Sequence, residues 1–179
     1  MRFFYTIILC LTLAVPAYAA GGGSDDDADV ITMKSRILEH EEAHTATKAL
    51  KAIGMLDMFG DMERAGKLTI FIPSDDAFYA LLKGKPKSVE DPRNKERLKA
   101  IFEHSTIEQS LYIENFNNGV SQFMTLRGDI FRVDKGWSSL KLNGQDVKII
   151  DSMLDPKNGH VFIIDQVLIP ENLPALGAK

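Results

Sequence analysis

The sequence predicts an α+β fold in which helices come first and antiparallel strands follow. Between Val30 and Phe59, apolar residues recur at the spacing of helical turns. In the C-terminal third, short apolar segments surround turn signals, and Asn143-Gly144 is the strongest short hairpin signal in the chain. Because the helical segments and the strands are grouped and do not alternate, the pattern favours α+β over a series of βαβ units.

The first residues predict an export signal. Arg2 precedes an apolar run from Phe3 to Val15, which is followed by Pro16 and the small-x-small site Ala17-Tyr18-Ala19. This run is shorter than the about 20 residues that a membrane helix needs, and no second apolar run of that length follows. We therefore predict a secreted or periplasmic protein without a membrane span.

The chain divides accordingly into four parts. They are a signal peptide at 1–20, a flexible acidic leader at 21–29, a folded domain at 30–172 and a C-terminal tail at 173–179. The one cysteine, Cys10, lies in the apolar run, so the exported chain has no cysteine and depends on its core for stability. The formal net charge of −4 gives no general argument for binding nucleic acid. We expect a monomer or a weak oligomer.

The helical half is predicted to contain two helices with a break between them. The first apolar stripe ends at Leu38, and the second begins at Ala46. The periodicity lapses around 39–45, where Thr45 is a candidate cap for the second helix. Gly54 marks the C-terminal region of that helix.

A strand is predicted next, at Leu68–Ile72, because its residues are mostly β-branched or aromatic. Pro73 ends the strand, and Ser74 is placed to cap the helix that follows. Asp75 lies in the first turn of that helix, where the helix dipole favours an anion. A further helix is predicted at Asn94–Glu103.

The remaining elements are predicted strands. Phe123–Leu126 and Ile130–Val133 flank the tight-turn signal Arg127-Gly128-Asp129, and a second hairpin surrounds Asn143-Gly144. Val161–Ile169 is almost wholly apolar, which is typical of a central strand.

The stretch His40-Glu41-Glu42-Ala43-His44 fits the zinc-peptidase pattern H-E-x-x-H. On one helix, the two histidines would share a face and a Zn²⁺ ion, and Glu41 would activate the bound water. The predicted helix break falls inside this stretch, however, and Glu63, the candidate third ligand, stands in a turn-like context. We therefore predict no enzyme, no catalytic residues, no cofactor and no metal. A zinc metallopeptidase is kept as the last alternative, with His40 and His44 as its candidate ligands.

Two long segments resemble the signatures of the fasciclin, or FAS1, domain family. "TIFIPSDDAF" at Thr69–Phe78 is similar to T-V-F-A-P-T-D-E-A-F, and "NGHVFIIDQVLIP" at Asn158–Pro170 is similar to N-G-V-I-H-V-I-D-K-V-L-L-P. The two segments stand in the family's order, and the similarity covers roughly Ile31 to Pro170. The resemblance implies a wedge of two antiparallel β-sheets flanked by helices, and a role in adhesion or interaction without catalysis.

The resemblance also implies a structural role for the residues that match the family's motifs. They are Thr69, Phe71, Pro73, Asp75, Phe78, His104, Gly159, Asp165 and Pro170. We interpret Asp165 as an acceptor of hydrogen bonds from loop amides, since a buried carboxylate needs partners. An Asp-Ile dipeptide tied to integrin binding in animal relatives would fall near Met153-Leu154, where its aspartate is absent. Integrin recognition is therefore not implied.

The prediction that follows is an exported FAS1 module that recognises a protein or a glycan at a cell surface or in a matrix. A local basic cluster is the candidate binding patch, with Lys83, Lys85, Lys87 and Arg93. It supports the alternative of a periplasmic protein that binds a polyanion or a small ligand, although we favour an ordinary solvated loop and helix face as its explanation. Trp137, the one tryptophan, is either a packed ring or an exposed contact for a sugar or a protein.

Overall fold

The structure is a computed structural model, and it describes residues 32–60, 68–83, 86–113, 118–155, 159–171 and 173. The chain divides into two units, Met1–Val30 and Ile31–Lys179, and every described residue belongs to the second. The predicted signal peptide and acidic leader, and the predicted tail after residue 173, lie outside the described residues. Among the residues that the structure describes, no helix is long and apolar enough to cross a membrane.

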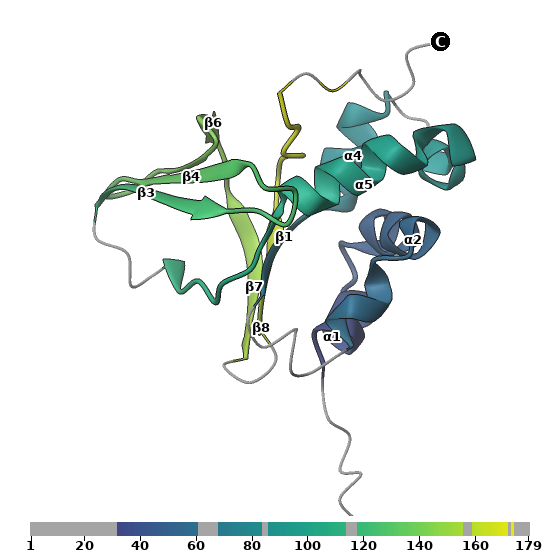
Figure 1. Cartoon of the computed structure of the whole chain (residues 1–179), viewed down its shortest axis with the longest axis horizontal. Helices are drawn as coiled ribbons and strands as arrows, with labels where there is room; N and C mark the ends of the chain where they lie inside the picture. The colour runs from purple at the N-terminus through teal and green to yellow at the C-terminus, as the bar shows by residue number, and fades with distance from the viewer. Residues whose placement is uncertain are drawn as a thin grey trace, which may run out of the picture. The chain divides into compact units, whose positions relative to one another are not determined.

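Helices form one side of the second unit (Figure 1). They are α1 (Met33–Glu39), α2 (His44–Ile53), α4 (Asp75–Leu81), α5 (Lys95–His104) and 3₁₀ helices at Leu56–Phe59, Pro86–Glu90 and Pro92–Asn94. Thr32 and Ser35 form a capping box at the start of α1, in which each side chain accepts a hydrogen bond from the other residue's backbone N–H. Gly54 ends α2 with a φ of 77°, a conformation that costs glycine little. The prediction of two helices with a break is confirmed.

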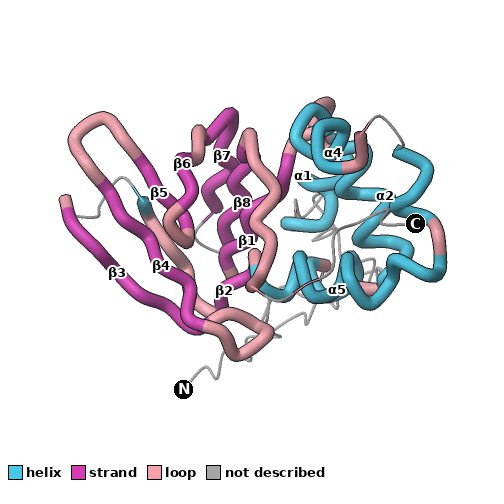
Figure 2. The backbone as a smooth tube through the Cα atoms, turned by 90° about the horizontal axis from the view of Figure 1, so that it is seen from above, coloured by secondary structure: helices cyan, strands magenta, loops and turns pink. Residues whose placement is uncertain are grey.

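Two four-stranded sheets form the other side (Figure 2). The strands are β1 (Thr69–Pro73), β2 (Thr106–Ile107), β3 (Gly119–Met124), β4 (Ile130–Lys135), β5 (Leu140–Leu142), β6 (Gln145–Asp146), β7 (Ile149–Asp155) and β8 (Gly159–Ile164). We call the sheet with strand order β2-β1-β8-β7 the core sheet, and the sheet with order β3-β4-β5-β6 the outer sheet. Figure 1 shows that the two sheets meet at an angle and that the helices cover the core sheet. The α+β class is confirmed.

β1 and β8 lie within the two signature segments and run side by side in parallel. Thr69 is opposite His160 at one end, and Pro73 is opposite Ile164 at the other. This pairing corrects the expectation of two antiparallel sheets, because the core sheet is mixed and only the outer sheet is wholly antiparallel. A parallel pair needs a long crossover, and the chain between β1 and β8 supplies it through α4, α5 and the outer sheet.

The side chains of β1 and β8 are buried on both faces of the core sheet, which explains their almost continuous apolar sequences. One face contributes to a core shared with the helices, through Ile70, Ile72, Val161 and Ile163. The other face contributes to a core shared with the outer sheet, through Phe71, Phe162 and Ile164. Since successive residues of a strand point to opposite faces, this one strand pair holds both halves of the domain.

Stacked phenylalanine rings join the two sheets. The ring of Phe71 lies 5.1 Å from that of Phe131 in the outer sheet and 5.3 Å from that of Phe162 in the core sheet, measured between centroids. The ring planes differ by only 10° and 17°, and all three side chains are fully buried. Such aromatic pairs contribute about 0.5–1.5 kcal/mol beyond the burial of their area. The stack therefore anchors the outer sheet to the core sheet.

We predict that Phe131→Ala lowers the free energy of unfolding by about 3–5 kcal/mol, because it leaves a cavity beneath the stack. Urea denaturation followed by circular dichroism measures this change. The matched control is Ile130→Ala, next along the same strand, where the side chain is 63% exposed and the expected change is below about 0.5 kcal/mol. Equal effects of the two substitutions would contradict the role of the stack.

Candidate functional site

The parallel pairing of β1 and β8 brings the carboxyl ends of both strands to the same edge of the core sheet. Ser74 and Asp75 follow β1, and Asp165 and Gln166 follow β8. An open pocket of about 480 Å³ lies at this edge and is lined by these four residues among others. Crevices outside the carboxyl ends of parallel strands are common binding sites in proteins. The position of the pocket is a consequence of the strand pairing.

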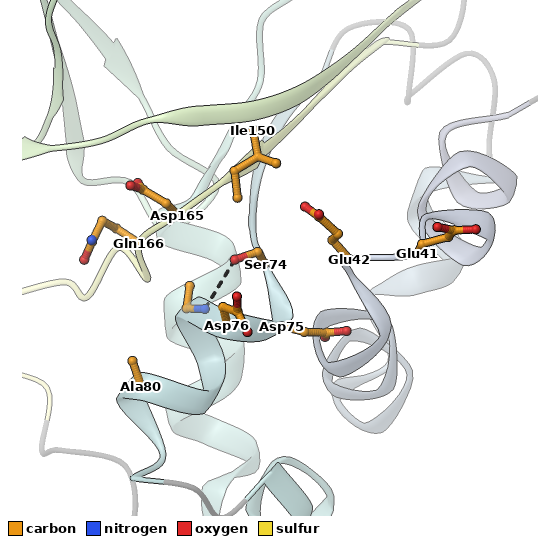
Figure 3. A pocket seen from close by; sticks show the side chains of 10 residues that line it. Glu41, Glu42, Ser74, Asp75, Asp76, Ala80, Ile150, Asp165 and Gln166 are labelled. Carbon is orange, nitrogen blue, oxygen red and sulfur yellow. Dashed lines mark hydrogen bonds between the residues drawn. The ribbon is translucent and has the colours of Figure 1, made fainter.

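Carboxylates dominate the lining of this pocket (Figure 3). They come from the segment between α1 and α2, from α4 and from the end of β8: Glu41, Glu42, Asp75, Asp76 and Asp165. Figure 3 shows Glu42 and Asp165 on either side of Ile150, whose side chain is 42% exposed. The pocket therefore combines several negative charges with apolar contacts from Ile150, Ala77 and Ala80.

A second pocket, of about 420 Å³, continues the first. It shares Glu41, Glu42 and Ile150 with the first pocket, and its other lining residues are Glu39, His40 and Asp151. We call the two pockets together the acidic groove. No Lys or Arg occurs among the described residues that line it. A groove lined by charges of one sign concentrates their electrostatic field, so this groove attracts cationic groups.

Asp75 caps helix α2 from a distant position in the sequence. Its Oδ1 accepts a hydrogen bond of 2.6 Å from the backbone N–H of Thr45, and its own N–H donates to the Glu42 carbonyl at 2.8 Å. Its Oδ2 lies 3.4 Å from Nδ1 of His44. Burial raises the pKa of Asp75, but the hydrogen bonds from Thr45 and His44 outweigh burial and hold that pKa below its usual range.

This contact corrects the predicted cap of the second helix. Helix α2 begins at His44, its N-cap residue is Ala43, and no side chain at that position caps it. Thr45 therefore receives the cap from Asp75 and does not provide one. Ser74, in contrast, caps α4 as predicted, since its Oγ accepts a hydrogen bond from the Ala77 N–H at 3.2 Å.

The structure separates the two histidines of the H-E-x-x-H stretch. His40 follows the last residue of α1 and His44 is the first residue of α2, so no helix carries both. Nε2 of His40 lies 3.0 Å from Oδ2 of Asp151, whereas His44 faces Asp75. Glu63 lies outside the described residues, and within them no three His, Cys, Asp or Glu side chains form a potential metal site. The stretch does not have the geometry of a zinc peptidase.

A second polar cluster lies away from the groove, where α5 meets two hairpin turns. Nδ1 of His104 is 3.1 Å from Oδ2 of Asp129, and Nε2 is 2.9 Å from Nδ2 of Asn143. The Oδ1 of Asn143 accepts a hydrogen bond of 2.8 Å from the Arg132 N–H, which directs the NH₂ group toward His104. A ring nitrogen that faces an NH₂ group must accept, so the His104 ring is neutral and donates from Nδ1.

The surroundings of His104 favour this neutral form. Burial lowers the pKa of His104 and outweighs the carboxylate of Asp129, which raises it, while the positive charge of Arg127 adds to the lowering. The histidine thus joins α5 to both hairpins, and its protonation would remove the acceptor that the Asn143 NH₂ group needs.

The other residues that match the family's motifs lie in the interior or support loops. Oγ1 of Thr69 donates to the Gln109 carbonyl at 2.7 Å and accepts from the Leu111 N–H at 2.9 Å. Phe71, Phe78, Pro73, Gly159 and Pro170 are buried. Asp165 accepts a hydrogen bond of 2.8 Å from the Lys148 N–H. It is the first residue after β8, which ends at Ile164, whereas the predicted strand reached Ile169. These contacts support the structural roles that the resemblance implies.

Two residues of the predicted basic patch, Lys83 and Arg93, are not among the described residues that line the acidic groove. Lys83 is exposed, and Arg93 is paired with Asp91 through a contact of 2.6 Å. Lys85 and the side chain of Lys87 lie outside the described part of the chain, so the patch stays a prediction. Trp137 is 96% exposed, which makes it a surface residue and not a packed ring.

The sequence analysis did not identify the groove, and the residues that it missed include Asp76, Ile150, Asp151 and Gln166. A signal for two of them was present, because Asp76 and Gln166 each come shortly after a signature strand. Parallel pairing of those strands would have placed both residues at one edge.

We predict that Asp75→Ala lowers the free energy of unfolding by about 2 kcal/mol, because α2 loses its only side-chain cap among the described contacts. Asp76→Ala is the control in the same turn of α4, where loss of a favourable helix-dipole interaction costs about 0.5 kcal/mol. Urea denaturation near neutral pH measures both changes in the free energy of unfolding. If Asp76→Ala destabilised the protein as much as Asp75→Ala, the capping role would be wrong.

We predict that His104 makes stability fall as the pH drops below its unfolded pKa of about 6.5. Folding lowers the pKa of His104, so below that pH the unfolded chain binds a proton more readily than the folded chain does. This preference for the unfolded chain lowers the free energy of unfolding as the pH falls. Denaturation midpoints between pH 8 and pH 5 measure this slope. His104→Gln should flatten it, because the glutamine side chain does not titrate in this range. An unchanged slope in His104→Gln would refute the prediction.

Comparison with known proteins agrees with this architecture. The family model of the Fasciclin domain matches residues 41–170. Protein sll1483 of Synechocystis sp. is 26% identical over 126 residues, which cover 70% of this chain and 68% of that protein. The fasciclin-like arabinogalactan protein CTB11 of Cercospora beticola is 27% identical over 141 residues, which cover 75% of this chain but only 36% of that protein.

A solved structure shares the fold. The FAS1 domain pair of the insect cell adhesion molecule fasciclin I superposes with a TM-score of 0.62 at 16% identity, covering 79% of this chain and 52% of that one. The chain thus spans about half of the insect pair, and the predicted FAS1-type arrangement of two sheets and helices is confirmed. Because the family model matches most of the chain, including both signature strands, the chain belongs to the fasciclin domain family.

Proposed function

We propose that this chain is an exported, non-catalytic interaction module that recognises a protein or a glycan at a cell surface or in a matrix. Fasciclin domains often act in cell adhesion and are typically extracellular or secreted. The insect domain pair with the same fold comes from a cell adhesion molecule. Both facts favour recognition over chemistry as the task of this domain.

The observation that carries the proposal is the bonding of the polar motif residues. Thr69, Asp75 and Asp165 each bond a backbone group of another segment through a side-chain oxygen. Nucleophilic and acid–base catalysis need such groups directed at a substrate, with a partner that activates them. Here they hold loops and helix ends in place, so the function belongs to the surface that they shape.

We place recognition in the acidic groove. The groove is concave, its lining is negative, and Ile150 offers an apolar contact at the point that its two pockets share. Complementary charge directs encounter and selects partners, while burial of an apolar side chain adds affinity. The chemistry favours a cationic segment of a surface protein. A polyanion would instead have to bind the basic patch at Lys83 and Arg93.

A direct test uses the purified protein and surface proteins and polysaccharides from the cells that produce it. In the groove variant, Glu41→Gln, Glu42→Gln and Asp76→Asn remove three charges, and no internal hydrogen bond or ion pair of these side chains is present in the described part of the chain. We expect its binding to weaken about tenfold or more, and wild-type binding to weaken as salt rises.

The control variant is Lys83→Gln with Arg93→Gln, which changes charge on the other surface and should bind as the wild type does. Loss of binding in this control with full binding in the groove variant would replace the proposal with the polyanion alternative. Full binding in both variants would refute the groove as the contact surface.

A further inference from the structure

The edge strands of the two sheets differ in how well they are protected from pairing with another chain. Edge strands are usually short or carry charges, because their free N–H and C=O groups can pair with a foreign strand. β2 and β6 have two residues each, and β7 carries Asp151 and Asp155. β3 has six residues, with neither a charge nor a proline. The uncharged stretch extends from Asn115 to Leu126, in a chain that is 26% charged.

The hydrogen bonds of the β3–β4 turn indicate which backbone groups of β3 face the open edge. The N–H of Thr125 donates to the Asp129 carbonyl at 3.0 Å, so Thr125 bonds toward β4. Bonded and non-bonded pairs alternate along an antiparallel ladder. The residues that bond toward β4 are then Gly119, Ser121 and Phe123. The residues whose N–H and C=O groups face the edge are Val120, Gln122 and Met124.

This edge has a defined length. In the described part of the chain, β4 is the one strand that pairs with Gly119–Met124. Past Met124 the edge is closed, since the Leu126 N–H donates to the Thr106 carbonyl at 2.9 Å. Figures 1 and 2 show β3 at the border of the outer sheet, on the side away from α2 and α4.

The edge-facing residues also expose their side chains on the outer face of the sheet. Val120 is 48% exposed and Met124 is 61% exposed, and Gln122 lies exposed between them. Met124 stands opposite Ile130 of β4, which is 63% exposed. Large apolar side chains that gather on a strand edge mark an interaction surface or an aggregation risk.

We propose that β3 is a self-association surface, at which two copies of this chain pair edge to edge in antiparallel orientation. A twofold axis beside Gln122 makes the strand complementary to itself. Val120 then stands opposite the partner's Met124, and Gln122 stands opposite the partner's Gln122. Apolar residues meet apolar residues, an amide meets an amide, and no like charges oppose each other. The contact is isologous and closes at a dimer.

The pairing extends both outer sheets into one continuous sheet, with four strands from each copy. It also forms an apolar row across the junction, from Ile130 through Met124 to the partner's Val120. A contact of a single short strand buries little area, so the dimer is weak and forms only as concentration rises. This surface is separate from the acidic groove, and the inference goes beyond the proposed function.

The test is sedimentation velocity of the purified protein over a roughly hundredfold range of concentration. We expect the wild type to shift from monomer to dimer. Gln122→Lys and Gln122→Glu should each weaken the dimer about tenfold or more, because each places like charges opposite across the axis. An equimolar mixture of these two variants should dimerise again, since opposite charges then meet.

The matched controls are Gln145→Lys and Gln145→Glu, on the exposed edge strand β6, which should associate as the wild type does. A wild type that stays monomeric throughout would overturn the proposal, even if it captured an extended peptide. So would Gln122 variants that associate normally, or a mixture that fails to regain the dimer. Circular dichroism checks that every variant is folded.

Discussion

The parallel pairing of β1 with β8 is the constraint on which the rest of this structure depends. It unites two segments that begin at Thr69 and Gly159 and are separated by most of the domain. Because both strands are buried on both faces, helices pack on one side of them and the outer sheet packs on the other. On the side of the outer sheet, the ring of Phe71 stacks against Phe131 of that sheet and against Phe162 of the core sheet. A change in this register would displace both cores at once.

The same pairing explains where a binding surface can form. Parallel strands end at one edge, so the polar residues that follow β1 and β8 converge there. Asp75 caps α2, and Asp165 holds the amide of Lys148, while neighbouring carboxylates face the solvent. The motif residues Asp75 and Asp165 therefore form part of the groove wall, and the carboxylates beside them add to its negative charge. This division of labour fits a family whose domains generally act without catalysis.

Features set by neighbours in the sequence could be predicted from the sequence. The Ser74 cap, the end of α2 at Gly54 and the hairpin at Asn143 each depend on residues within one turn, and the helix break in the H-E-x-x-H stretch followed from lost periodicity. Distant partners could not be read in this way. The hydrogen bond from Thr45 to Asp75 spans 30 residues, and the side-chain NH₂ of Asn143 donates a hydrogen bond to His104 in α5. Local periodicity carries no information about such contacts, nor about the parallel direction of β8.

Native-state amide hydrogen exchange tests the central claim most directly. The hydrogen bonds from His160 to Leu68 and from Ser74 to Ile164 show that the amides of Ile72 and Phe162 lie between β1 and β8. If the β1–β8 pair holds both halves of the domain, these two amides exchange only through global unfolding, with the free energy that denaturant gives. Amides at the open edge of β3, such as Val120 and Gln122, exchange through smaller openings. The account is contradicted if Ile72 and Phe162 exchange through a local opening while Val133 in the outer sheet stays protected.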